Sequence, residues 1–300
     1  MRKPVHLACG ALAAIVLAAH SPPARAHAVV GARFFPATLA TDDPAVADEL
    51  SLPTIASFKT GDDPAVRQLD ISGEYAKRLT SRLGVSLEET WTHLGDPENA
   101  AGFQNIETTV KYQFLTSPEH EAILAAGLGV EWSGSGAERV GAEHHTTITP
   151  TLYFGKGFGD LPESVSWARP FAMTGLVGYS IPSRGHDGEE ANPKVLSYGM
   201  ALEYSLPYLR AQVKDLGLPA FLNHLTPLVE ARFETPLDAP GSRTTGSINP
   251  GVIWAGRRFQ VGAEAVIPVN RDSGRGVGWM VQLHLYLDDL FPSSLRKPIW

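Results

Sequence analysis

The sequence contains one cysteine among its 300 residues, and this residue, Cys9, lies within the N-terminal apolar run LACGALAAIVLAA. If that run is removed on export, the mature chain contains no cysteine. Disulfides, thiol catalysis and cysteine-based metal sites are then excluded. We expect no metal centre and no cofactor.

Long apolar runs and catalytic motifs are also missing. After the N-terminal run, no segment reaches about 18 uninterrupted apolar residues, which excludes a membrane-spanning helix. The sequence has no G-x-S-x-G motif, and no serine has an evident histidine partner. We therefore expect no enzyme, and an outer-membrane lipid-modifying enzyme is the weaker of two alternative functions.

Basic residues are fewer than acidic ones, 25 against 32. The first 26 residues hold Arg2, Lys3 and Arg25 but no acid, so the mature chain keeps 22 basic and 32 acidic residues and a net charge of −10. A chain this acidic is not expected to bind nucleic acid.

Residues 1–26 have the organisation of a secretory signal peptide. Arg2 and Lys3 precede about 13 apolar residues, and cleavage sites of the A-x-A type end at Ala26 and Ala28. Where a lipoprotein signal has an apolar residue the chain has His6, so lipidation of Cys9 is not expected. The chain is predicted to be exported.

Apolar and polar residues alternate along the mature chain. In VQLHLYLDD, residues 281–289, the apolar residues Val281, Leu283 and Leu285 alternate with Gln282 and His284. A period of two marks a strand with one apolar and one polar face. The pattern predicts twelve strands, at 52–59, 67–78, 82–92, 103–115, 121–132, 145–155, 166–180, 195–206, 225–235, 246–255, 257–268 and 276–288.

Strand and loop lengths favour a membrane barrel over a soluble sandwich. Most of the strands have about 9–12 residues, as tilted strands crossing hydrocarbon require. Short connections near 79–81, 116–120 and 255–256 alternate with longer ones near 93–102, 133–144, 181–194 and 236–245. Outer-membrane barrels have short periplasmic turns and long outer loops in this way. The predicted fold is all-β, a closed antiparallel transmembrane β-barrel of about 12 strands.

Two segments do not fit the strand pattern. Residues 27–51 form a short N-terminal segment that lies in the periplasm or plugs the lumen, and the barrel occupies residues 52–300. Residues 207–224 should be a short turn but are long, and they read as an amphipathic helix or a spacer.

Three stretches resemble one known family. They are GFQNIETTVKYQFL (102–115), INPGVIWAG (248–256) and QVGAEAVIPVNRDSGRGVGWMVQLHLYLDDLFP (260–292). They are similar to outer-membrane transporters of the phenol meta-pathway degradation type. The resemblance implies an outer-membrane channel or transporter for small solutes, hydrophobic or cationic, and implies no catalytic residue.

In such a barrel the polar faces line the lumen, and Leu283 and Leu285 face lipid. The lumen-facing candidates are Glu74, Glu88, Glu107, Lys111, Glu131, Arg169, Glu203, Glu230, Arg232, Glu264, Gln282 and His284. These charges either brace the barrel or set the ion selectivity of a pore. The excess of glutamate suggests an acid-lined pore that favours cations.

The expected partners are outer-membrane lipid, small-molecule solutes and the outer-membrane assembly machinery. The main alternative is an exported soluble β-sandwich that binds a ligand. That fold leaves the alternation of loop lengths unexplained.

Overall fold

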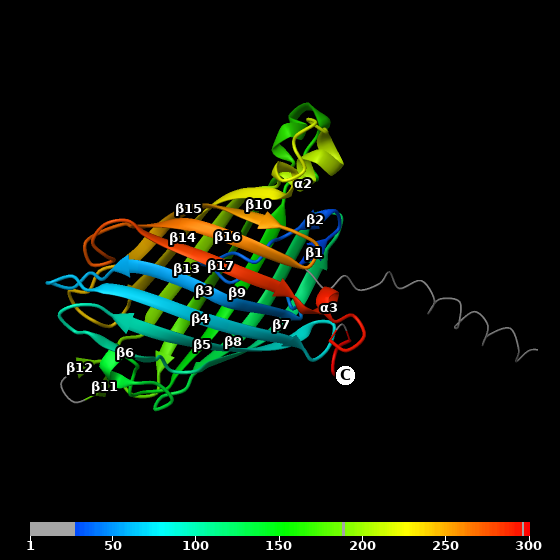
Figure 1. The fold of residues 1–300 in the computed structure, drawn as a ribbon. Coiled ribbons are helices and arrows are strands. Elements are labelled where there is room, and N and C mark those ends of the chain that lie inside the picture. Colours follow the sequence, from blue (N-terminus) through cyan, green and yellow to red (C-terminus); the bar gives the residue numbers. More distant parts are fainter. Residues whose placement is uncertain (1–27, 188–189, 296) are drawn as a thin grey trace, which may run out of the picture.

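The computed structural model describes residues 28–187, 190–295 and 297–300, so the predicted signal peptide lies outside the described residues. Twelve antiparallel strands form a closed ring, in which each strand pairs with its neighbours in sequence and the last pairs with the first (Figure 1). They are β3 (Glu49–Lys59), β4 (Arg67–Arg78), β5 (Leu83–Leu94), β7 (Glu107–Ser117), β8 (Ala122–Glu131), β9 (Thr147–Gly157), β10 (Phe171–Pro182), β13 (Val195–Tyr204), β14 (Leu225–Pro236), β15 (Thr245–Ala255), β16 (Phe259–Pro268) and β17 (Gly278–Tyr286). The predicted fold class is confirmed.

The strand boundaries differ from the predicted ones in a few places. β3 begins at Glu49 instead of residue 52, and β10 begins at Phe171 because Glu163–Ala168 form the 3₁₀ helix η3. The sequence pattern missed β6 (Ala100–Phe103), a short strand that pairs with the end of β5 outside the ring. Two small hairpins, β1–β2 (Val29–Val30 and Arg33–Phe34) and β11–β12 (His186–Asp187 and Glu190–Ala191), form separate sheets.

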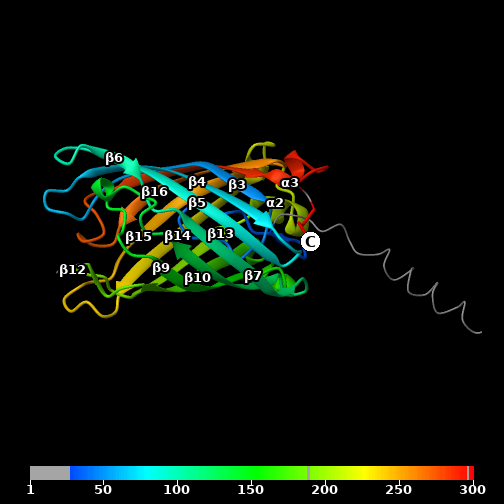
Figure 2. The ribbon, with the colours of Figure 1, turned by 90° about the horizontal axis from the view of Figure 1, so that it is seen from below.

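The two ends of the barrel carry different connections. The longer loops lie at one end and comprise residues 60–66, 95–106, 132–146, 183–187 with 190–194, 237–244 and 269–277. Tight turns at 79–82, 118–121 and 256–258 lie at the other end, which we call the short-turn end and which also holds the C-terminus (Figure 1 and Figure 2). Two connections at the short-turn end are long, 158–170 and 205–224.

The connection 205–224 is helical only in short pieces. It contains α2 (Leu206–Tyr208), the π-helical turn η4 (Leu209–Val213) and η5 (Leu222–His224). The Ser205 side chain caps α2 by accepting a bond from the Tyr208 N–H at 3.2 Å. This connection projects sideways from the barrel wall (Figure 1), so it does not cover the mouth of the barrel as a flat lid.

The wall is apolar outside and polar inside. Large apolar side chains on strand after strand are exposed, among them Leu87, Leu128, Leu152, Val177, Met200, Val229, Ile248 and Val261. Inward side chains of the same strands are buried and polar, among them Thr92, Thr174, Glu203, Glu230, Asn249 and Gln260. A water-soluble protein has the opposite arrangement. None of the helices in the described part of the chain is both long and apolar enough to span a membrane.

Candidate functional site: the barrel lumen

Residues 28–48, which we call the N-terminal segment, lie against the inner wall of the barrel. Their first anchor is Arg33, whose side chain is fully buried. Its guanidinium donates to Glu121 Oε2 at 3.1 Å, to the Pro170 carbonyl at 3.0 Å and to the Arg169 carbonyl. The same group lies 3.7 Å from the centre of the Tyr208 ring. Arg33 therefore ties the β1–β2 hairpin to three connections at the short-turn end, 118–121, 158–170 and 205–224.

Tyr208 completes this anchor from the connection 205–224. Its hydroxyl donates to Glu121 Oε1 at 2.8 Å. Burial, together with this hydrogen bond, raises the pKa of Tyr208 to about 12. The phenol is therefore neutral at physiological pH and remains a hydrogen-bond donor to the carboxylate.

A small apolar cluster holds the hairpin next to this anchor. Phe35 is 1% exposed and packs with Ala28 and Val30 of the segment and with Ile123 and Ala172 of the wall. The interior of the barrel is otherwise mainly polar, so this cluster supplies local hydrophobic burial for the segment.

Glu230 is the second anchor and is fully buried. Its carboxylate accepts hydrogen bonds from the Leu39 N–H at 2.7 Å, from the Ala40 N–H at 3.2 Å and from Thr41 Oγ1 at 2.5 Å. Bonds from several donors to one buried carboxylate are of the stronger, charge-assisted kind. They fix the backbone of the segment across the lumen.

Three ion pairs hold the rest of the segment. Lys111 Nζ lies 2.8 Å from Asp42 Oδ2 and also donates to the Asp43 carbonyl at 2.8 Å. Asp48 is fully buried and lies 2.9 Å from Lys77 Nζ and 2.8 Å from the Arg78 guanidinium. The Asp48 pairs fix the point where the segment enters β3.

Four inward glycines give residues 39–46 of the segment room. A Cβ atom at any of these positions would lie within 3.1 Å of a segment side chain, closer than most Cβ contacts in proteins. The pairs are Gly84 with Val46, Gly155 with Pro44, Gly199 with Thr41 and Gly262 with Leu39. Glycine inside a strand often marks such a close approach. The contacts run from β16 through β13 and β9 to β5, so the segment follows the inner wall around more than half of the ring.

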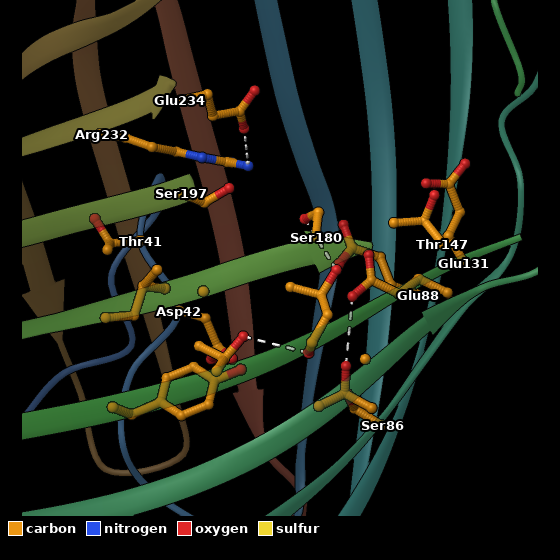
Figure 3. Close-up of a pocket in the computed structure, with 18 of the residues that line it drawn as sticks. Thr41, Asp42, Ser86, Glu88, Glu131, Thr147, Ser180, Ser197, Arg232 and Glu234 are labelled. Carbon is orange, nitrogen blue, oxygen red and sulfur yellow. Dashed lines mark hydrogen bonds and ion pairs between the residues drawn. The ribbon is translucent and has the colours of Figure 1, made fainter. Parts of the chain in front are cut away.

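Above the segment, toward the long loops, lies a cavity of about 330 Å³ (Figure 3). Six carboxylates and one guanidinium line it, with serine and threonine hydroxyls between them. These charged residues are Asp42, Glu74, Glu88, Glu107, Glu131, Glu234 and Arg232. Arg232 and Glu234 lie on one wall, 3.0 Å apart, with Glu88 and Glu131 opposite. Cavities of about 190 and 450 Å³ adjoin it and share Glu88 and Arg232 with it.

The predicted lumen residues fall into three groups. Glu74, Glu88, Glu107, Glu131 and Arg232 line the main cavity, and Lys111, Gln282 and His284 line the adjoining cavity of about 190 Å³. Glu203, Glu230 and Glu264 are inward but at most 4% exposed. Arg169 is placed elsewhere, in the connection 158–170.

Arg169 is not in the lumen wall, because β10 begins after it. Its guanidinium lies 3.0 Å from Glu163 Oε2 and donates to the Leu161 carbonyl at 2.7 Å. Only its backbone carbonyl contributes to the interior, as an acceptor for Arg33. The predicted start of the strand at residue 166 is therefore wrong by five residues, since β10 begins at Phe171.

The expectation that no serine has a histidine partner is wrong. Ser51 Oγ lies 2.8 Å from His284 Nδ1, and His284 Nε2 lies 3.3 Å from Glu49 Oε2, although this second contact lacks hydrogen-bond geometry. His284 pairs with Ser51 across β17 and β3, and Glu49 pairs with Tyr286 next to them. Their proximity thus follows from strand register, and Ser51 is only 9% exposed. The group joins the first strand to the last.

No protein-family model matches the chain, and no curated protein sequence matches it. Among solved structures, the KdgM porin aligns at 11% identity with a TM-score of 0.48, over 78% of this chain and 98% of that chain. The NanC porin aligns at 8% identity with a TM-score of 0.48, over 78% of this chain and 98% of that chain. An outer membrane channel from Pseudomonas putida F1 aligns at 10% identity with a TM-score of 0.49, over 84% of this chain and 99% of that chain. At these identities and TM-scores the matches assign neither a family nor a solute. The likeness to the phenol meta-pathway type stays a prediction.

Proposed function

We propose that this protein is an outer-membrane β-barrel channel for small solutes whose lumen is closed by its own N-terminal segment. The observation that carries the proposal is the inverted wall, with apolar side chains exposed around the ring and carboxylates facing an internal cavity. Exposed apolar residues on every side are stable only in contact with lipid, and transmembrane barrels alternate in this way. Lipid, small solutes and the assembly machinery of the outer membrane are then its partners.

The soluble alternative is not supported by this wall. A β-sandwich buries apolar residues between two packed sheets. Here one sheet closes on itself, and its interior holds Glu203, Glu230 and Gln260 at 1% exposure or less. An exported β-sandwich binding protein is therefore not proposed.

A lipid-modifying enzyme is not supported either. An acyl-chain hydrolase needs a nucleophile that lipid can reach and donors aimed at the developing oxyanion. Ser51 points into the lumen, and its partner His284 is 3% exposed. We assign this pair to the closure of the barrel.

The orientation follows from the connections. Long loops of such barrels lie outside the cell and short turns lie in the periplasm. The carboxylate-lined cavity then opens outward, and Arg33 and the hairpin close the periplasmic half. The N-terminal segment is a plug in this proposal.

The charge of the cavity favours cationic solutes. Six carboxylates against one guanidinium produce a negative potential, which concentrates cations and repels anions in a narrow, poorly screened space. The lining has hydroxyls between the acids and few apolar side chains. Small cationic solutes are thus favoured over hydrophobic ones.

Ion selectivity tests this proposal. The chain without residues 28–47 is inserted into a planar bilayer under a salt gradient, and the reversal potential is measured. We expect cation preference, and we expect Glu107→Gln with Glu131→Gln to reduce it. Glu98→Gln, which removes one carboxylate from an exposed loop, should leave the potential unchanged. Anion preference contradicts the acid-lined pore, and absence of current from the inserted shortened chain contradicts the channel.

A further inference from the structure

The outer wall carries an apolar hollow at the short-turn end, apart from the lumen. Its volume is about 420 Å³, and its lining includes Phe221, Leu225, Val252, Trp254 and Ala263. Val252 pairs with Ala263 across β15 and β16, so both face outward. Ala263 is the smallest side chain on this face of the hollow, and its lack of bulk leaves the space.

The connection 205–224 forms one side of the hollow. Phe221 is 63% exposed and stacks on Trp254, with ring centres 6.3 Å apart and an angle of 17° between the planes. The His224 ring lies 5.4 Å from Trp254, and its Nδ1 lies 2.8 Å from the Ala255 carbonyl. These contacts hold the projecting connection (Figure 1) beside the wall. The hollow therefore has a fixed aromatic edge.

The next turn of the chain carries positive charge. Trp254 packs against Gly256, where an added Cβ atom would lie 2.9 Å from the indole ring. Arg257 and Arg258 follow Gly256 directly in the sequence. Both arginines are exposed, and within the described part of the chain neither makes an ion pair. Lys214 on the neighbouring connection is also exposed. An apolar hollow thus adjoins a free basic turn.

We infer that this hollow is a binding site for one anionic phospholipid of the periplasmic leaflet. The acyl chain lies along Val252, Ala263 and Phe221, and the headgroup phosphate meets Arg257 and Arg258. Guanidinium groups suit phosphate because they present several donors in one plane. Basic residues next to a membrane surface favour anionic lipid for the same electrostatic reason. The site rests on the proposed membrane location and is independent of the lumen.

The charge of the turn decides among possible occupants. A second copy of this chain is acidic overall, but a two-fold interface would place the same surface of both copies together. The two arginines of one copy would then face the two arginines of the other, and like charges repel. A lipid supplies both an apolar chain and a negative group. Binding of a protein at this surface instead of lipid would overturn the inference.

Native mass spectrometry of the mature protein tests the site, with phosphatidylglycerol and phosphatidylethanolamine titrated separately into detergent. We expect one phosphatidylglycerol to bind more tightly than the rest. Ala263→Phe fills the hollow and should weaken this binding about tenfold, the equivalent of ~1.4 kcal/mol. Arg257→Gln with Arg258→Gln should weaken phosphatidylglycerol binding more than phosphatidylethanolamine binding and so remove the preference for phosphatidylglycerol, because only phosphatidylglycerol carries a net negative charge.

Ala231→Phe is the matched control. Ala231 also faces outward, since it pairs with the exposed residues Met200 and Ile248, but it lies away from the hollow. It should bind lipid as the unaltered protein does. Equal binding by Ala263→Phe, equal loss in Ala231→Phe, or a dimer in place of a lipid adduct would each refute the site. If the unaltered protein does not insert into bilayers, the proposed function fails; if it inserts and shows no preferred lipid, only this inference fails.

Discussion

Glu230→Gln is expected to release the N-terminal segment from the barrel wall. The carboxylate of Glu230 accepts from the Leu39 and Ala40 N–H groups and from Thr41 Oγ1. The amide keeps one oxygen for the two backbone donors but loses the negative charge. Its NH₂ group then faces Thr41, whose hydroxyl can rotate to accept.

The magnitude follows from the two backbone bonds. A hydrogen bond to a charged group contributes about 1.5–3 kcal/mol and a neutral one about 0.5–1.5 kcal/mol. Loss of the charge from two bonds therefore costs ~2–3 kcal/mol. At 1.4 kcal/mol per factor of ten, the released state becomes about 30 to 150 times more populated.

Trypsin cleavage after Arg33 measures this population. Arg33 is fully buried, so the bond after it is cut only when the segment leaves its seat. With slow cleavage, the rate follows the population of the open state. The rate of appearance of the fragment that begins at Phe34 should rise by the same factor, read by mass spectrometry.

Glu203→Gln is the control for this measurement. Glu203 is also inward and 1% exposed, and the hydrogen bond found for it goes to Thr174 of the wall at 3.4 Å. It should leave the cleavage rate unchanged. Unaltered cleavage in Glu230→Gln, or equal acceleration in Glu203→Gln, would refute the anchoring role of Glu230.

Three further predictions address the wall and the plug. Leu152 lies on the outer face of β9 and is 60% exposed, so Leu152→Arg should destabilise the inserted barrel by about 2–4 kcal/mol. Thr151 is one residue away and faces the cavity, so Thr151→Arg should assemble normally. A heat-modifiability gel compares the assembly of the two variants. Gly262→Leu should displace Leu39, whose Cδ1 lies 2.4 Å from the position of a Cβ there, and raise conductance, and adding Leu39→Ala should restore the closed state. A fluorophosphonate probe should not label Ser51, and labelling that Ser51→Ala abolishes would reopen the enzyme alternative.

The strands were predictable because apolar and polar residues alternate within each stretch of about ten residues. The apolar half meets lipid and the polar half meets the lumen, so the local pattern is enough to place Glu107 and Leu283. The prediction for Arg169 was wrong because SVSWA forms the helical turn η3 in place of the first residues of the predicted strand. Nothing in the spacing of those residues distinguishes the two structures.

The course of the N-terminal segment was not predictable from local pattern. Its backbone is irregular, and its bonds join residues as far apart as Thr41 and Glu230. The inward glycines were a visible signal, since Gly84, Gly155 and Gly199 each interrupt a strand without a turn. They indicate that something approaches the wall there, but not which segment it is. The pairing of Ser51 with His284 was missed because only closure of the ring brings the first strand to the last.

Single-channel conductance with and without residues 28–47 tests the central claim most directly. Deletion up to Ala47 removes the Arg33 anchor, the donors to Glu230 and the Asp42 pair, and it keeps Asp48 with Lys77 and Arg78. We predict little or no current from the inserted mature chain and a steady, cation-preferring current from the shortened one. Equal currents from both, whether open or absent, would contradict a channel closed by its own N-terminal segment.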